Sequence, residues 1–230
     1  MIHFVMQRIR VRFSRGEEIK FISHLDITKL WEKALRRAGV PLTYSQGFSP
    51  HPQISLAMPL SVGMTSDAEL MDILCDRQVT PQWFEGAVNQ QLPAGIAILQ
   101  SQPVSPLLPS LQSQVRFAEY RVEIKTGKSR EEIEAAISHL LSLTSLSWQH
   151  QRDTGTKTYD LRPLIADLSV FEWQSGRVTL SMRLRSDSSG TGRPEQVAAA
   201  AGFSEYPDVI HRTALILETT KNVSNQRTPT

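Results

Sequence analysis

The first regular pattern in the chain is an alternation of charged and apolar residues near its start. In RIRVRF, residues 8–13, arginines alternate with Ile9, Val11 and Phe13. A period of two residues is typical of a β-strand with one buried and one solvated face. The pattern predicts a strand whose solvated face is basic. That face would consist of Arg8, Arg10 and Arg12.

The next segment has the period of an amphipathic helix. Ser23 is followed three residues later by Asp26, the spacing of a capping box, and Gly39-Val40-Pro41 ends the pattern. One side of the predicted helix is apolar and the other is cationic. The apolar side consists of Ile27, Leu30, Trp31, Ala34, Leu35 and Ala38. We call the cationic side the basic stripe, and it consists of Lys29, Lys33, Arg36 and Arg37.

Strand and helix patterns then alternate through the rest of the first half. QISLAMPL and AELMDILCD read as strands, Thr80-Pro81 begins a helix with proline at its favoured first position, and GIAILQSQPV predicts another strand. The stretch SPLLPSLQSQ, residues 105–114, has the proline, serine and glutamine content of a linker.

The same order of elements is predicted after the linker. AEYRVEIKT is a strand, and Ser129 with Glu132 begins the helix SREEIEAAISHLLS. Hairpin strands are predicted in LSWQHQ, KTYDLRPLIADLSVFEW and RVTLSMRLR, followed by a short helix in RPEQVAAAAGF and a last strand in VIHRTALILE.

The repeated order predicts an α+β protein of two tandem ferredoxin-like (split β-α-β) domains with antiparallel sheets. The domains would span residues 7–104 and 115–218, joined by the 105–114 linker. Residues 219–230 have no apolar periodicity, so we expect a disordered tail.

Charge is distributed unevenly along the 230 residues, although the formal net charge is only +2. Residues 1–50 hold nine lysines and arginines against four acids, whereas residues 51–112 hold one arginine against five acids. A basic segment of this kind is typical either of a surface for a polyanion or of a solvated face with ion pairs.

Several classes of protein are excluded by composition. A single cysteine, Cys75, cannot form an intrachain disulfide, a cysteine-rich zinc site or the CxxxCxxC triplet that holds a radical SAM cluster. The sequence has no apolar run near the ~20 residues of a membrane span and no secretory leader at its start. We therefore expect a cytoplasmic protein with no membrane partner and no metal site.

Residues 20–64, KFISHLDITKLWEKALRRAGVPLTYSQGFSPHPQISLAMPLSVGM, strongly resemble the radical SAM-linked protein family, domain of unknown function DUF2344. The resemblance continues through AELMDI, TYDLRPLI, GRPEQV and HRTALIL, up to about Glu218. Members often carry histidine or asparagine before the proline-histidine-proline loop and lysine after it, where this chain has Ser49 and Gln53.

The resemblance implies an accessory role beside a radical SAM protein, either fused to this chain or separate. S-adenosylmethionine, the iron-sulfur cluster and cobalamin would then belong to the partner alone, and this chain would need no cofactor. The paired ferredoxin-like plan is also similar to that of RNA-binding CRISPR endonucleases. We therefore expect a module that binds tRNA or rRNA, or presents a substrate, without being catalytic. Nothing in the sequence points to DNA.

The loop YSQGFSPHPQ after the basic helix combines the side chains that read single-stranded RNA: an aromatic ring, hydrogen-bonding groups and neighbouring cations. His51 is held between two prolines, which restrict its backbone. We take as candidate RNA or substrate contacts the basic stripe together with His24, Tyr44, Ser45, Gln46, Phe48, His51, Asp160 and Arg162.

Each candidate also has a structural interpretation. His24 could simply support the helix cap, Phe48 could be buried in the core, the basic stripe could be only a solvated face, and Asp160 with Arg162 could form a structural pair. Two further functions stay open. One is a metal-independent RNA-processing enzyme using His24 and His51, and the other is a pure protein-protein interaction module.

Overall fold

One nine-stranded β-sheet extends through both halves of the protein in the computed structural model, which describes residues 6–152 and 155–218. We call residues 6–110 the N-terminal half and residues 111–218 the C-terminal half. The N-terminal half contains β1 (Gln7–Arg15), the 3-10 turn η1 (Glu17–Ile19), α1 (His24–Arg37), β2 (Ile54–Leu56), β3 (Thr65–Cys75), α2 (Pro81–Asn89) and β4 (Ile96–Val104).

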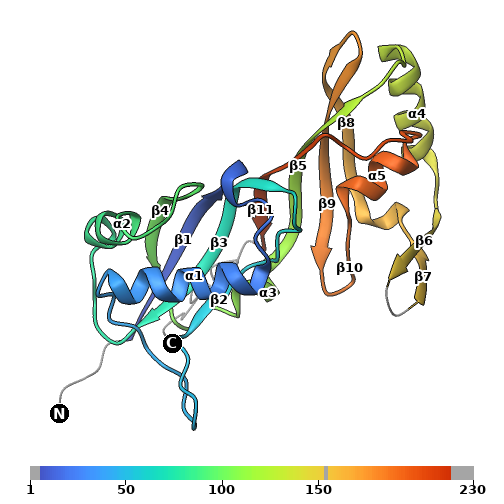
Figure 1. Cartoon of the computed structure of the whole chain (residues 1–230). Helices are drawn as coiled ribbons and strands as arrows, with labels where there is room; N and C mark the ends of the chain where they lie inside the picture. Colours follow the sequence, from blue (N-terminus) through green and yellow to red (C-terminus); the bar gives the residue numbers. More distant parts are fainter. Residues whose placement is uncertain (1–5, 153–154, 219–230) are drawn as a thin grey trace, which may run out of the picture.

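The C-terminal half contains α3 (Leu111–Gln114), β5 (Val115–Lys125), α4 (Arg130–Ser142), β6 (Ser147–Arg152), β7 (Gly155–Asp160), the 3-10 turn η2 (Arg162–Leu164), β8 (Ile165–Gln174), β9 (Arg177–Asp187), β10 (Gly190–Thr191), α5 (Pro194–Ala200) and β11 (Val209–Leu217). The order in the large sheet is β10-β9-β5-β11-β3-β1-β4, with β2 beside β3 and β8 beside β9. β6 and β7 form a separate hairpin (Figure 1).

The expected α+β class with mostly antiparallel pairing is confirmed, whereas the expected separate sheets are replaced by one continuous sheet. The predicted strand QISLAMPL is reduced to the three residues of β2, which pair only with residues 71–73 of β3. The beginning of β3 is therefore left open for β11, which pairs with it in parallel at Thr65 and Ser66. An unpaired strand edge is unfavourable, and this pairing removes it. The proposed domain boundaries stay a prediction.

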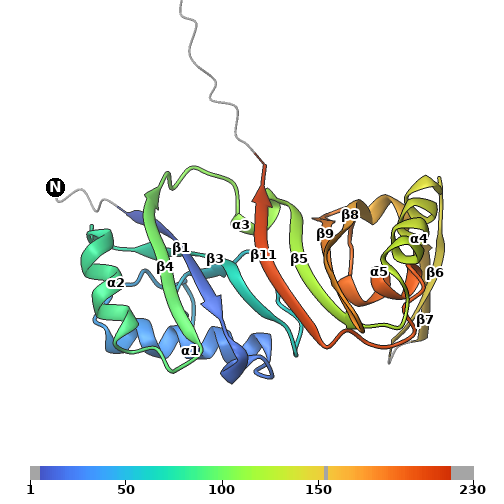
Figure 2. The same ribbon diagram turned by 90° about the horizontal axis from the view of Figure 1, so that it is seen from above.

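Helices cover one face of the sheet in each half (Figures 1 and 2). Beneath α1 and α2, the N-terminal core includes Phe13, Trp31 and Phe84, and the Phe13 and Trp31 rings meet edge to face at 4.9 Å. The C-terminal core lies beneath α4 and α5. Leu60 and Met64, from the loop before β3, join the C-terminal core, so apolar packing continues across the junction of the halves.

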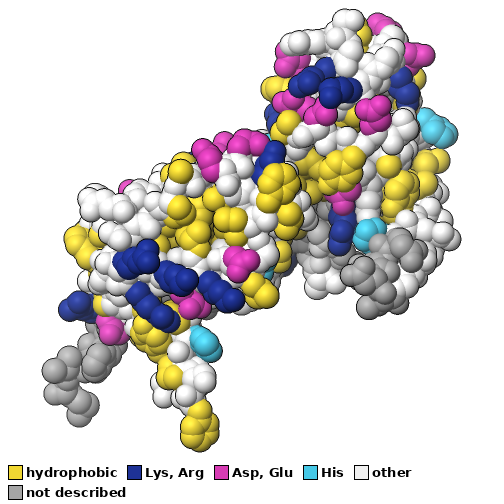
Figure 3. Space-filling view, viewed as in Figure 1, with side chains coloured by type: hydrophobic (Ala, Val, Ile, Leu, Met, Phe, Trp, Pro, Cys, Tyr) yellow, Lys and Arg dark blue, Asp and Glu magenta, His cyan; other side chains and the backbone are white. Residues whose placement is uncertain are grey.

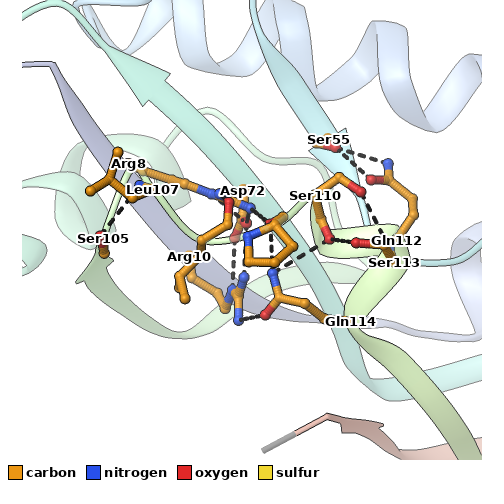
Figure 4. A network of polar contacts seen from close by, with 12 residues as sticks. Arg8, Arg10, Ser55, Asp72, Ser105, Leu107, Ser110, Gln112, Ser113 and Gln114 are labelled. Carbon is orange, nitrogen blue, oxygen red and sulfur yellow. Dashed lines mark hydrogen bonds and ion pairs between the residues drawn. The ribbon is translucent and has the colours of Figure 1, made fainter. Parts of the chain in front are cut away.

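The face of β1 that was expected to be solvated and basic is largely buried, and this prediction is wrong for two of its three arginines. Arg8 is 8% exposed and donates from Nε to Asp72 at 2.7 Å, while Arg10 donates to the other oxygen of Asp72 at 2.8 Å (Figure 4). Asp72 lies directly opposite Arg10 on β3. Arg12 alone is exposed.

The predicted linker is what covers this face. The Arg8 guanidinium donates to the carbonyls of Leu108 and Pro109 at 2.7 and 3.0 Å, and Leu111 is fully buried beside Ala57 and Val115. Residues 105–114 thus pack on the sheet and end in the short helix α3, in place of a free connection. The predicted tail at 219–230 lies outside the described residues.

A buried cluster of charges joins the two halves beside the β11–β3 pairing. Arg212 of β11 is 1% exposed and donates to Glu69 of β3 at 2.9 Å, to the Tyr120 hydroxyl at 3.3 Å and to the Pro59 carbonyl at 3.1 Å. Arg15, also buried, interacts electrostatically with both Glu69 and Arg212. The cluster holds two cations and one anion, and its carboxylate is therefore essential to it.

We expect Glu69→Gln to lower the free energy of unfolding by ~3–5 kcal/mol, because removing one partner leaves a buried charge uncompensated. Urea denaturation monitored by tryptophan fluorescence measures the change. The matched control is Glu134→Gln, which removes a half-exposed ion pair with Arg130 on α4 and should cost only ~0.3–0.5 kcal/mol. Equal losses in the two variants would contradict the role assigned to Glu69.

Candidate nucleic-acid interface

The basic stripe is exposed on α1, as its helical period indicated. Ser23 caps the helix by accepting from the Asp26 backbone N–H at 3.2 Å. The buried side of α1 is formed by Ile27, Trp31, Ala34 and Leu35. All four members of the stripe, Lys29, Lys33, Arg36 and Arg37, are exposed on the opposite side. Figure 3 shows a row of lysine and arginine side chains over α1.

Most of the positive charge in the stripe is not neutralised by neighbouring acids. Arg36 lies 3.6 Å from Glu32, and among the described residues this is the only ion pair that a member of the stripe makes. Both side chains of that pair are partly exposed, so their attraction is weak. The stripe can therefore offer its cations to an external anion.

Residues 43–53 fold back on themselves as a hairpin that leaves the body of the protein (Figures 1 and 3). The backbone N–H of Ser45 donates to the His51 carbonyl at 2.9 Å, and that of Gln53 donates to the Thr43 carbonyl at 2.8 Å. Tyr44 and Pro52 form a bridge between the two arms. We call this segment the 43–53 hairpin. Its arms are fixed by hydrogen bonds, although it carries two prolines.

The side chain of Phe48 lies fully in solvent at the tip of the 43–53 hairpin, with a relative exposure of 109%. The structural interpretation of Phe48 as a buried anchor is therefore wrong. Gly47 beside it has φ +128°, a conformation that other residues rarely adopt, which lets the chain turn at the tip. Leaving a phenylalanine exposed forgoes ~1.5–3 kcal/mol of burial. The ring is therefore available to an external partner.

The other candidates in the 43–53 hairpin divide into structural and free side chains. Ser45 accepts from the His51 backbone N–H at 3.0 Å through its hydroxyl and so helps to hold the arms together. Tyr44 lies at the base, with its ring 6.0 Å from the Arg36 guanidinium, which links the hairpin to the basic stripe. The side chains of Gln46 and His51 are on exposed residues and make no hydrogen bond among the described residues.

His24 is the first residue of α1 and is half-buried. Its carbonyl accepts from the Thr28 hydroxyl at 3.0 Å. Within the described part of the chain, no hydrogen bond or ion pair joins the imidazoles of His24 and His51. The use of the two histidines in an RNA-processing enzyme stays a prediction.

Asp160 and Arg162 lie in the other half of the molecule, and each anchors backbone. Asp160 accepts from the N–H groups of Leu146 and Arg162 at 2.8 and 3.0 Å. The hydrogen bond from Leu146 is the main reason that the pKa of Asp160 is lowered. Arg162 donates to the Leu141 carbonyl at 2.8 Å. The structure does not bring these two residues together with the basic stripe or the 43–53 hairpin.

Sequence analysis missed a cavity at the junction of the halves. It has a volume of about 920 Å³ and is lined by residues from the loop before β3, from β5, from the β6–β7 hairpin, from the turn at residues 189–194 and by Arg212. These segments are distant in sequence, so no local pattern could reveal the cavity. One continuous stretch of the sequence, the glycine-rich SSGTGRPEQV, contributes several of the lining residues.

Residues 6–152 and 155–218 show neither a metal site nor a membrane-spanning helix. No group of three or more His, Cys, Asp or Glu side chains is placed to hold a metal ion. No helix there is long and apolar enough to cross a membrane.

Comparisons with known proteins identify a family and a fold. The model of a family described as "Uncharacterized protein conserved in bacteria (DUF2344)" matches residues 8–194. None of the curated proteins matches the sequence. The chain is similar to a solved structure titled "Crystal Structure of a Cbf5-Nop10-Gar1 Complex", with a TM-score of 0.53 and 10% identity over 93% of this chain and 50% of that chain.

Two further solved structures share this likeness. One is an archaeal box H/ACA sRNP Nop10-Cbf5 complex, with a TM-score of 0.45 and 10% identity over 92% of this chain and 48% of that chain. The other is an H/ACA RNP bound to a substrate RNA containing 2'-deoxyuridine, with a TM-score of 0.43 and 11% identity over 90% of this chain and 46% of that chain. The chain spans about half the length of each of these three structures. At this identity the first likeness establishes similarity of fold alone.

The exposure of the 43–53 hairpin makes a prediction about stability. We expect Phe48→Ala and His51→Ala each to change the free energy of unfolding by no more than ~0.5 kcal/mol, because exposed side chains contribute little to folding. The control Phe84→Ala removes a fully buried ring and should cost ~3–5 kcal/mol. Denaturant unfolding of the three variants provides the comparison. A large loss in Phe48→Ala would return this ring to a structural role.

Proposed function

The chain belongs to the DUF2344 family of uncharacterized bacterial proteins, and from this premise we propose that it is an RNA-binding accessory module that is not itself catalytic. One observation carries the proposal: a fully exposed aromatic ring, Phe48, is held on a hydrogen-bonded hairpin next to a helix face with four exposed cations. Cations beside a stacking ring are the parts with which proteins bind single-stranded RNA.

The parts have distinct roles in this proposal. The basic stripe contacts phosphates, and this contact dominates affinity without reading sequence. Phe48 stacks on an unpaired base. Gln46 and His51 face the edges of that base or its neighbours. Ser45 holds the arms of the hairpin together, and Tyr44 orients the hairpin relative to Arg36. Asp160 and Arg162 have no role in this surface, because their polar groups are occupied in holding backbone.

The fold-level likeness to a Cbf5-Nop10-Gar1 complex does not assign this function, since one fold supports many activities. We also propose that each half is a ferredoxin-like unit. The strand orders β4-β1-β3-β2 and β11-β5-β9-β8 support this assignment. An experimental structure with a different strand order in either half would contradict it.

RNA binding predicts separate effects for the ring and for the cations. We expect Phe48→Ala to weaken binding of a single-stranded RNA by ~1–3 kcal/mol, the contribution of one stacked base. Reversing Arg36 and Arg37 to glutamate should also reduce the salt dependence, by about 0.7 in the slope for each lost phosphate contact on a single strand. Fluorescence anisotropy with labelled RNA across a salt series measures both effects.

The matched control reverses Arg77 and Lys125, two exposed cations outside the basic stripe. This control changes the net charge by the same amount as the Arg36 and Arg37 variant. It should leave the salt dependence of RNA binding nearly unchanged. A second experiment tests for cleavage: the purified protein is incubated with total tRNA and rRNA in the presence of EDTA. Defined fragments would overturn the non-catalytic role in favour of the enzyme that uses His24 and His51. Absence of binding even at low salt would overturn RNA binding and leave the protein-interaction module.

We further propose that the bound RNA or substrate is presented to a radical SAM protein, which supplies the cluster and S-adenosylmethionine. The resemblance of residues 20–64 to radical SAM-linked proteins supports this partner. After crosslinking in cells, purification of the tagged protein followed by mass spectrometry should recover a polypeptide with the CxxxCxxC motif. Recovery of RNA without any such polypeptide would contradict this partner while leaving RNA binding intact.

A further inference from the structure

The cavity at the junction of the halves contains more positive than negative charge. Its lining includes the cations Lys157, Arg185, Arg193 and Arg212, against the two acids Asp160 and Glu195. The ion pairs that the rim arginines make are long: Arg185 lies 3.5 Å from Asp187, and Arg193 lies 4.0 Å from Glu195. Lys157 makes no ion pair among the described residues. These cations can therefore turn to an anion inside the cavity.

The inner end of the cavity keeps this excess of positive charge, because the two charged groups behind Arg212 cancel each other. Arg212 lines the cavity, and its Nε is buried without a hydrogen-bond partner. Behind it, the single carboxylate of Glu69 faces both Arg212 and Arg15. Burial, and then repulsion from Arg212, lower the pKa of Arg15, while Glu69 opposes them. An arginine stays protonated in proteins, so the junction keeps an excess of one buried positive charge.

Apolar and aromatic surface provides the other part of the lining. Met58, Pro163 and Leu164 contribute aliphatic groups, and Tyr120 contributes a buried ring. The volume of about 920 Å³ lies in the range of small-molecule sites, which reaches about 1,000 Å³. Such sites combine apolar walls with a few convergent polar groups. The cavity thus suits a ligand with an anionic end and an apolar or planar body.

We propose that this cavity binds a phosphorylated small molecule of nucleotide size. The phosphate lies toward Arg185, Arg193 and Lys157, where several cations can match a charge greater than one. The planar part lies against Tyr120 and the aliphatic lining. This site is separate from the basic stripe and the 43–53 hairpin, and it does not depend on the RNA-binding proposal.

The test is titration calorimetry of the full chain with AMP and UMP, and with adenosine and uridine as partners that lack phosphate. We expect both nucleotides to bind at least about tenfold tighter than their nucleosides, because hydrogen bonds to charged groups are the stronger ones. The double variant Arg185→Ala and Arg193→Ala should weaken nucleotide binding by about tenfold or more. This comparison avoids Arg212, whose loss threatens folding.

The matched control is the double variant Arg177→Ala and Arg183→Ala, which removes the same charge from β9, the strand of Arg185, at positions outside the cavity. It should bind nucleotides as the unaltered protein does, and so should Phe48→Ala, which separates this site from the RNA surface. A 5'-phosphorylated RNA trinucleotide distinguishes the source of the phosphate. Tighter binding of the trinucleotide than of UMP indicates an RNA end, and weaker binding indicates a free nucleotide. The second outcome supports the proposal, and the first would assign the phosphate site to an RNA end in place of a small molecule.

Three further results would overturn the proposal. The first is absence of nucleotide binding at millimolar concentration. The second is equal affinity for nucleotides and nucleosides, which would remove the role of the phosphate. The third is an equal loss of nucleotide affinity in the two double variants. The loss would then come from the change in net charge and not from this cavity.

Discussion

The buried ion pair between Arg212 and Glu69 is the interaction on which the arrangement of the two halves depends. Each partner comes from a different half, and the pair lies beside the only parallel pairing in the described sheet, between β11 and β3. A guanidinium without its carboxylate would be expensive to bury, because desolvation of a charge must be offset by a partner and by hydrogen bonds. Tyr120 and the Pro59 carbonyl provide those additional bonds. The register of the two halves is thereby defined.

Local sequence patterns were sufficient where the local chain decides the structure. The helix α1 follows from the cap at Ser23 and from a period that places Trp31 inward and Lys33 outward. The same kind of reasoning failed for Arg8 and Arg10, although their alternation was read correctly as a strand. What buries that face is Asp72 and the carbonyls of residues 108 and 109, which are distant in sequence. A period of two residues predicts which side chains share a face of the strand. It does not predict whether another part of the chain covers that face.

Candidate sites show the same division. The sequence indicated that the 43–53 hairpin was polar and constrained, yet it left the position of Phe48 open between core and solvent. That question is decided by the hydrogen bonds that pair the two arms and direct the tip away from the sheet. The cavity could not be predicted at all, because Arg212, Tyr120 and Arg193 converge only through the fold. Asp160 and Arg162 were candidates because their spacing places them on one face of a predicted strand, and in the structure they hold the backbone near η2.

The continuous sheet also restricts how the protein can move. Two lobes with a cavity between them usually suggest a hinge, with ligand entry coupled to opening of the lobes. Here the lobes share backbone hydrogen bonds, a buried charge cluster on one face and the apolar contact of Ala57 with Leu111 and Val115 on the other. Rotation of one lobe against the other would break all three at once. Entry to the cavity therefore does not depend on a rotation of the lobes, and the frame that positions the cations stays rigid.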